Sequence, residues 1–269
     1  MISRRSLFLL FVLLSLLVSA SNITFAAKPD KQHFYFVQIT DTHLGDLDND
    51  ARTIKVVQSI NALPMKIECV VHTGDIFQDN ILDTKIVQNG NSILKQLKAP
   101  VHYVSGNHDI LQGNDLEKTA SVFRDILGPV SSKAQYKGVI FLMFYSEPLC
   151  DSFKLNDYDP MKWLKQSLDE TKGKPVIIFT HRPTAQDFYN NSMHDTWPKE
   201  AQDQFSKLIN SYNVKAVITG HYHRAEQHWL KKVPVFVASP VAGYWDRDAT
   251  YRIYEYDNGK IGFRTQYPK

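Results

Sequence analysis

The sequence predicts an α/β protein in which sheet is buried beneath helices. Short apolar runs rich in β-branched and aromatic residues recur along the chain, and such runs are typical of buried strands. Several of these runs are separated by segments whose apolar residues have helical spacing. With 269 residues, 43% of them hydrophobic, the chain is long enough to bury a full core.

The predicted elements alternate for most of the chain. Asp159 followed by Pro160 is a favourable helix start, and Gly128-Pro129 closes the helix before it. Strands are expected at residues 34–39, 67–71, 101–104, 139–145, 176–179 and 216–218, and helices at 50–63, 83–97, 115–127, 159–170 and 199–212.

Beyond Gly220 the pattern changes to strands alone. One strand is expected at residues 233–238. Residues 252–256 alternate between apolar and polar side chains and precede Asn258-Gly259, a strong hairpin signal.

The N-terminal segment has the layout of a signal peptide. Arg4 and Arg5 precede an almost wholly apolar stretch at 7–18, and small residues follow. This stretch is shorter than the roughly 20 residues that span a bilayer as a helix, so no stable membrane anchor is expected. We expect cleavage of residues 1–27, a single domain at 28–269, and a periplasmic or secreted location. The paired arginines leave both the general and the twin-arginine export routes open.

Charge and cysteine content exclude some classes of protein. Residues 1–27 carry two arginines and no acidic residue, so their removal lowers the net charge from +3 to +1. The sequence contains no basic stripe with interleaved aromatic residues of the kind that forms a nucleic-acid surface. A small phosphate ester is the more suitable partner. Two cysteines are too few for a disulfide scaffold. Cys69 is either a buried thiol in an apolar strand or bridged to Cys150.

Polar side chains that bind metals follow five of the predicted strands. In open α/β sheets ligands bind beyond the carboxyl ends of the strands, so these side chains can converge on one place. They are Asp41 and His43, then Asp75, then Asn107, His108 and Asp109, then His181, and finally His221 and His223.

The spacing within these clusters has a physical meaning. The pairs Asp41-x-His43 and His221-x-His223 have two-residue spacing, which on an extended backbone directs both side chains to the same side. Oxygen and imidazole ligands without thiolate favour divalent or trivalent manganese, iron or zinc. Each cluster alone is weak, because Gly-Asp and Asp-x-His are common in ordinary loops. The five clusters together are a strong signal, because without a shared site each would have to arise independently at the end of its strand.

The ordered set Asp-x-His, Gly-Asp, Gly-Asn-His-Asp, His and Gly-His-x-His, spanning residues 41–223, resembles the signature of calcineurin-like metallophosphoesterases. This resemblance implies a two-sheet sandwich flanked by helices and two metal ions bridged by Asp75 and a hydroxide that attacks the phosphate ester. His108, beside Asn107, resembles the family's general acid or transition-state donor, and we expect Asp109 to orient it. The two implied ligand sets are Asp41, His43, Asp75 and His223 for one ion, and Asp75, Asn107, His181 and His221 for the other.

Several alternatives remain at this point. The substrates are phosphodiesters or phosphomonoesters, and the motif set also resembles the bacterial class of cyclic-nucleotide phosphodiesterases. A non-catalytic metal-binding or ligand-binding protein on the same fold is a different class. The aromatic residues in the segment 187–197, together with Tyr244 and Trp245, either shape a substrate pocket or form a small satellite core. The remaining histidines are expected to be mostly structural: His33, His72, His102, His194 and His228.

Overall fold

The computed structural model describes residues 32–191, 194 and 196–268. The expected signal peptide, residues 1–27, lies outside this part of the chain. Within the described residues no helix has the length and apolar character that crossing a bilayer requires.

The first sheet has five strands in the order β11-β10-β1-β2-β3. Its parallel part is formed by β1 (His33–Ile39), β2 (Ile67–Thr73) and β3 (Val101–Val104). The C-terminal hairpin of β10 (Tyr251–Asp257) and β11 (Lys260–Gln266) adds antiparallel to β1. The predicted hairpin is therefore the edge of this sheet.

The second sheet has six strands in the order β4-β5-β6-β7-β9-β8. Four neighbours, β5, β6, β7 and β9, run parallel, and β4 and β8 pair antiparallel at the two edges. The bounds are β4 Ser132–Tyr136, β5 Val139–Met143, β6 Val176–Phe179, β7 Val214–Thr219, β8 Glu226–Leu230 and β9 Val233–Val237.

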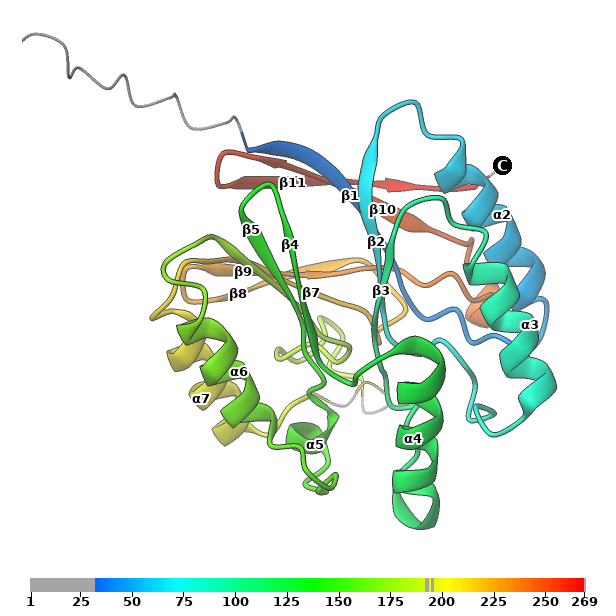
Figure 1. Ribbon diagram of the computed structural model, residues 1–269, viewed down its shortest axis with the longest axis horizontal. Helices are drawn as coiled ribbons and strands as arrows, with labels where there is room; N and C mark the ends of the chain where they lie inside the picture. The colour runs from blue at the N-terminus through cyan, green and yellow to red at the C-terminus, as the bar shows by residue number, and fades with distance from the viewer. Residues whose placement is uncertain (1–31, 192–193, 195, 269) are drawn as a thin grey trace, which may run out of the picture. The chain divides into compact units, whose positions relative to one another are not determined.

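Helices cover the outer face of each sheet, as Figure 1 shows. On the first sheet, α2 and α3 bury Val56 and Val87 against Val37 and Ile39 of β1. On the second sheet, α6 and α7 pack against β6 and β7. The helices are α2 Asn49–Asn61, α3 Thr84–Leu94, α4 Leu116–Leu127, α5 Glu147–Cys150, α6 Pro160–Asp169 and α7 Lys199–Ile209, with short 3₁₀ turns at Gly113–Asp115 and Tyr244–Asp246.

An aromatic layer joins the inner faces of the two sheets. Phe36 of β1 stacks on Tyr254 with ring centroids 4.9 Å apart, and its edge meets Phe141 of β5 at 5.0 Å. Cys69 is buried in this layer, whereas Cys150 packs beneath the helices of the second sheet, and both are free thiols. The two-sheet sandwich flanked by helices is confirmed, and the possible Cys69–Cys150 bridge is wrong.

The parallel strands end at a common region of the molecule. Strands β1, β2 and β3 of the first sheet and β6 and β7 of the second are each followed by one of the five polar clusters. Both sheets therefore contribute side chains to the site.

Candidate metal centre

The backbone that carries the candidate ligands is strained. Five of them have positive φ angles: Asp41 (50°), His43 (43°), Asp75 (52°), His221 (70°) and His223 (50°). Non-glycine residues rarely adopt this region, and such strain concentrates at functional sites because it costs about 1–3 kcal/mol per residue. The strand ends are therefore bent sharply to direct these side chains into one volume.

Two glycines allow the loops to approach each other closely. A Cβ atom on Gly106 would lie 2.2 Å from Asp75 Oδ1, and one on Gly220 would lie 2.0 Å from Thr40 Oγ1. No side chain fits at either position. The Gly-Asn-His-Asp and Gly-His-x-His sequences thus begin with glycine for steric reasons.

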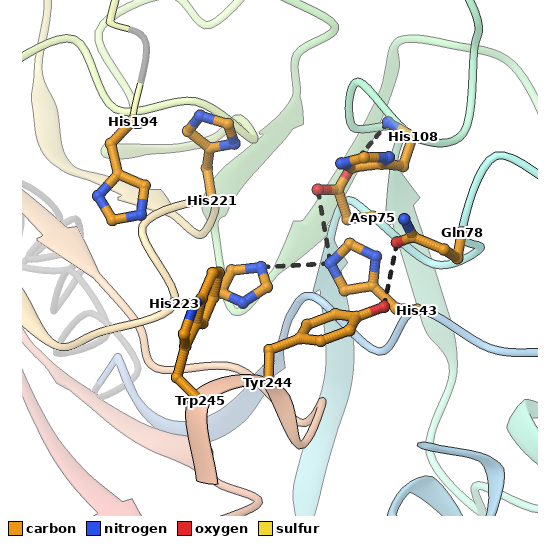
Figure 2. A pocket seen from close by; sticks show the side chains of 9 residues that line it. All are labelled: His43, Asp75, Gln78, His108, His194, His221, His223, Tyr244 and Trp245. Atoms are coloured by element: carbon orange, nitrogen blue, oxygen red, sulfur yellow. Dashed lines mark hydrogen bonds and ion pairs between the residues drawn. The ribbon is translucent and has the colours of Figure 1, made fainter. Parts of the chain in front are cut away.

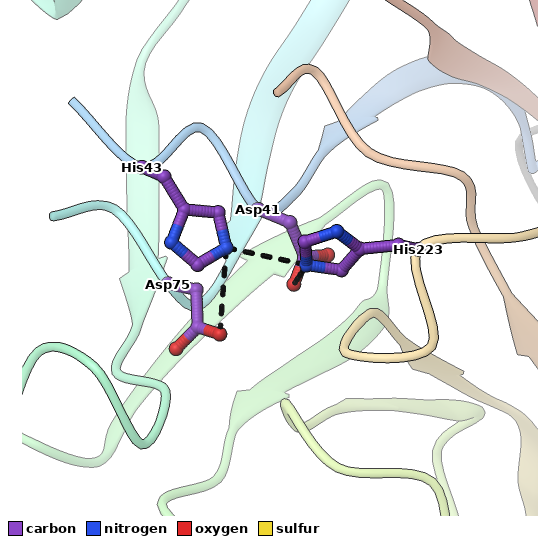
Figure 3. Close-up of side chains that lie close together, drawn as sticks. All are labelled: Asp41, His43, Asp75 and His223. Carbon is purple, nitrogen blue, oxygen red and sulfur yellow. Dashed lines mark hydrogen bonds and ion pairs between the residues drawn. The ribbon is translucent and has the colours of Figure 1, made fainter. Parts of the chain in front are cut away.

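The first group of candidate ligands is fully buried and combines both sheets (Figure 3). His43 Nε2 lies 3.2 Å from His223 Nε2 and 3.8 Å from Asp75 Oδ2. His223 Nε2 lies 3.4 Å from Asp41 Oδ1. One ligand atom from each of these four residues lies within 4.8 Å of all the others.

The second group shares Asp75 with the first and adds His181 and His221. His181 Nε2 lies 3.1 Å from Asp75 Oδ2. Its Nδ1 donates a hydrogen bond to the Thr73 carbonyl oxygen at 2.8 Å, which fixes the ring and directs Nε2 inward. Asn107 follows β3 on the same side.

These atoms fit metal ions, because several of them lack any other partner. Within the described part of the chain, Asn107 Oδ1 and His221 Nε2 are shielded from solvent without a hydrogen bond. Unpartnered buried polar atoms are costly, and a cation that accepts their lone pairs removes that cost. The donor set of carboxylate, amide and imidazole suits a divalent or other metal ion.

The electrostatics of the site keep Asp75 ionised, favour neutral imidazoles at His43 and His221, and favour a protonated His181. Burial alone would raise the pKa of Asp75, but His181 and His43 hold that pKa well below its usual range. Burial lowers the pKa of His43 to about 4 and the pKa of His221 well below normal. Burial also disfavours a charged His181, but Asp75 outweighs it and raises that pKa to about 10.

His108 stands at the edge of this cluster and is oriented by an unexpected partner. Its Nδ1 lies 2.9 Å from Asp79 Oδ1, and its backbone amide donates to Asp75 Oδ1 at 3.0 Å. Burial lowers the pKa of His108, but Asp75 and Asp79 together raise it above the ordinary value.

The expectation that Asp109 orients His108 is wrong. The Asp109 carboxylate points inward and accepts three backbone hydrogen bonds, from Ile76 and Phe77 at 2.9 Å and from Gly106 at 2.8 Å. Asp109 therefore holds the loops after β2 and β3 together and does not touch the His108 ring.

A pocket of about 270 Å³ opens onto the candidate ligands (Figure 2). His194, Tyr244 and Trp245 form the wall opposite His108 in this view. Sequence reasoning placed His194 among the structural histidines, and the aromatic character of the surrounding segment was the one signal for it. The nine lining residues are His43, Asp75, Gln78, His108, His194, His221, His223, Tyr244 and Trp245.

The aromatic residues near the site divide between the two roles expected for them. Trp197 is buried at 1% exposure and packs against Phe205, so it belongs to the core. Phe188, Tyr189 and Trp245 are 80%, 69% and 60% exposed. These three are available to a ligand.

Among the other histidines, His72 is fully buried, with Nε2 2.9 Å from Thr42 Oγ1. His33 and His228 pair with Glu255 and Glu226, and His102 bonds to Tyr136. None of these four lines the pocket at the ligand cluster.

Comparison with known proteins agrees with this arrangement. The family described as calcineurin-like phosphoesterase matches residues 34–225, most of the chain. Serine/threonine-protein phosphatase CPPED1 of Mus musculus is 25% identical over 245 residues, which cover 81% of this chain and 78% of the relative. A probable cyclic nucleotide phosphodiesterase of Colwellia psychrerythraea is 28% identical over 217 residues, covering 75% of each chain.

A solved structure confirms the fold independently. The dimetal phosphatase from Danio rerio superposes with a TM-score of 0.61 at 14% identity, over 88% of this chain and 99% of the zebrafish chain. With the family match over residues 34–225 and the buried carboxylate and imidazole cluster at the strand ends, the chain belongs to the calcineurin-like phosphoesterase family and is a metal-dependent phosphoric ester hydrolase.

Proposed function

We propose that this protein hydrolyses small phosphate monoesters or diesters at a centre of two metal ions. The observation that carries the proposal is that two groups of candidate ligands share one buried carboxylate, Asp75. The ions would be divalent or trivalent manganese, iron or zinc. The ligands would be Asp41, His43, Asp75 and His223 for one ion and Asp75, Asn107, His181 and His221 for the other.

When bound there, the ions supply Lewis-acid activation of water and charge neutralisation for the phosphate group. The side chains of the protein position the ions. The inward-directed imidazoles and carboxylates fix the position of the cations, and Asn107 contributes a neutral oxygen. The buried position of the cluster at the floor of the pocket limits competing contacts with solvent.

His108 is the proposed proton donor to the leaving group. Asp79 holds its Nδ1, so the Nε2 side of the ring is the one available to a substrate in the pocket. The raised pKa increases the protonated fraction of His108 at a given pH, and a general acid must be protonated to act. Asp79 acts through His108 and is therefore a positioning residue.

The named activities of the relatives differ, and this difference favours a second candidate function. One relative is named as a protein phosphatase and another as a probable cyclic nucleotide phosphodiesterase. A cyclic-nucleotide phosphodiesterase is accordingly the narrower alternative within the same chemistry.

The test is hydrolysis of p-nitrophenyl phosphate and bis-p-nitrophenyl phosphate after chelation and return of each metal. We expect activity to disappear with chelation and to return with manganese, iron or zinc, with about two ions per chain by elemental analysis. Asp75→Asn should lose both metal and activity, because both ligand groups use this carboxylate. Full metal occupancy without hydrolysis of any ester, cyclic nucleotides included, would instead indicate a non-catalytic binding protein.

A further inference from the structure

The metal pocket continues into a groove that the proposed chemistry does not use. His194 and Trp245 line both the metal pocket and a neighbouring cavity of about 230 Å³. Arg224 and Arg247 line that cavity and also a third one of about 580 Å³. We call the second and third cavities together the arginine groove. Besides these four residues, it is lined by Phe188, Tyr189, Asn191, Tyr222, His228 and the segment 225–227.

The two arginines of the groove differ in their partners. Arg224 is compensated, because its Nη2 lies 3.0 Å from Asp187 Oδ2 and its Nε lies 3.6 Å from Glu226 Oε1. The guanidinium of Arg247 has no ion pair or hydrogen bond with any described residue, and its Nε is shielded from solvent. Arg247 is half-buried, and its uncompensated positive charge is available to an anion that enters the groove.

The position of Arg247 is nevertheless fixed by its backbone. Its amide donates to the Tyr244 carbonyl oxygen at 3.3 Å, and its carbonyl oxygen accepts from the Arg52 guanidinium. The preceding residues Trp245 and Asp246 have positive φ angles of 56° and 53°. This strained turn places Trp245 at the metal pocket and Arg247 one step farther along the groove.

Aromatic side chains lie beside the arginines of the groove. Tyr189 lies beneath the Arg224 guanidinium, with 4.6 Å between the guanidinium carbon and the ring centroid. Trp245 packs with its edge toward His223, at 5.3 Å between ring centroids, and leaves most of its surface exposed (Figure 2). Exposed aromatic faces at a site offer stacking to a planar ligand.

We propose that the arginine groove binds the part of the substrate beyond the scissile phosphate, and that preferred substrates carry there a planar aromatic group and a second anionic group. Arg247 binds the anion through paired hydrogen bonds, and Trp245 contacts the aromatic ring. The inference rests on the proposed function, since it extends the same site toward a substrate class.

Binding of non-hydrolysable ligands tests the groove apart from turnover. Phenylphosphonate and its 3-carboxy and 4-carboxy derivatives are titrated by calorimetry into the full chain loaded with manganese or zinc. We expect at least one carboxylated ligand to bind about tenfold more tightly than phenylphosphonate, because a charge-assisted hydrogen bond is added. Arg247→Gln should bring the ratio of the dissociation constants close to one.

Lys232→Gln is the matched control, since it also removes one positive charge. It lies in the turn between β8 and β9, at the far end of the hairpin from Glu226 of the groove. This variant should keep the wild-type ratio. The aromatic preference is tested by cyclohexylphosphonate, which should bind more weakly than phenylphosphonate.

Hydrolysis of phenyl phosphate, bis-p-nitrophenyl phosphate and cyclic nucleotides is measured in parallel to separate the two proposals. If an ester is hydrolysed but plain and carboxylated phosphonates bind equally well, the proposal for the groove is overturned and the proposed function stands. The same holds if the preference for a carboxylated ligand survives Arg247→Gln. Selective binding without hydrolysis would overturn the proposed function and leave the groove standing. Failure of every phosphonate to bind would overturn the groove as well.

Discussion

Sequence reasoning identified His108 as a candidate site residue but did not identify Asp79 as its partner. The resemblance of the Gly-Asn-His-Asp motif implied a role for His108, whereas adjacency favoured Asp109 as its partner. The loop after β3 turns Asp109 inward to three backbone amides, and Asp79 from the preceding loop reaches the imidazole instead. Contacts between loops are set by tertiary structure, which spacing within one loop does not reveal.

We expect His108→Asn to lower kcat by about 100-fold or more while metal content stays at the wild-type level. Asp79→Asn should lower kcat less, because the imidazole remains but loses its orientation. The double variant should be no slower than His108→Asn, since Asp79 acts through the ring. Asp203→Asn, an exposed residue of α7 paired with Lys199, is the control. Additive losses in the double variant would show that Asp79 works independently of His108.

His72 provides a stability prediction with a definite sign. Burial lowers its pKa from 6.5 to about 3 in the folded protein, so protonation favours the unfolded chain. The stability is fully present above pH 6.5 and is lost progressively as the pH falls toward 3. Between pH 7 and pH 5 the expected loss in the free energy of unfolding from this group is about 2 kcal/mol.

His72→Gln has no such titration and should therefore lose less stability over the same interval. Urea unfolding of both metal-free proteins in chelator at pH 7 and pH 5 measures the difference. The other buried histidines titrate in both proteins and cancel in the comparison. Identical pH dependence of the two proteins would contradict the prediction.

At the scale of elements, the strands that carry the site were predictable, whereas the edge strands of the second sheet were not. Strands such as β6 are continuous apolar runs because both of their faces are covered. The edge strands β4 and β8 alternate between partly buried and exposed residues and carry few apolar side chains, so no apolar run marks them. Their pairing is supplied by the neighbouring strands β5 and β9.

The junction between the loops after β2 and β3 is expected to tolerate no side chain. Gly106→Ala would place a Cβ atom 2.2 Å from Asp75 Oδ1 and displace the shared carboxylate. We expect lower metal content by elemental analysis and a loss of stability of about 1–3 kcal/mol in denaturant. Gly262→Ala on the exposed strand β11, where a Cβ meets nothing within 4 Å, should change neither quantity. Normal metal content in Gly106→Ala would show that the loops can separate without loss of the site.

At the scale of the whole molecule, composition and periodicity predicted an α/β protein but not how its strands divide between sheets. The division depends on pairings between distant segments, such as β1 with β10, that leave no local pattern. The resemblance of the ordered motifs supplied the two-sheet arrangement. The contact of Phe36 in the first sheet with Phe141 in the second then helps to hold the sheets together.

We propose that residues 1–27 direct export and are removed, leaving 28–269 as the mature protein. The basic start and the apolar stretch that follow each other in this segment support the proposal. Expression of the full chain in a bacterium, followed by fractionation and intact-mass measurement, should give a periplasmic or secreted protein that begins at Lys28. Arg5→Lys distinguishes the export routes, because the twin-arginine route reads both arginines. An uncleaved protein retained with the cytoplasmic fraction would contradict the proposal.

The division of the ligand cluster between the two sheets also sets the time at which an ion can be captured. The segment ending at β3 brings Asp41, His43 and Asp75, whereas His223 follows β7 much later in the chain. A growing polypeptide on the ribosome therefore lacks the complete set of four ligands until synthesis has passed His223 and the second sheet has packed against the first. The complete ligand group therefore exists only late in the synthesis of the chain, and chains terminated before His223 lack it.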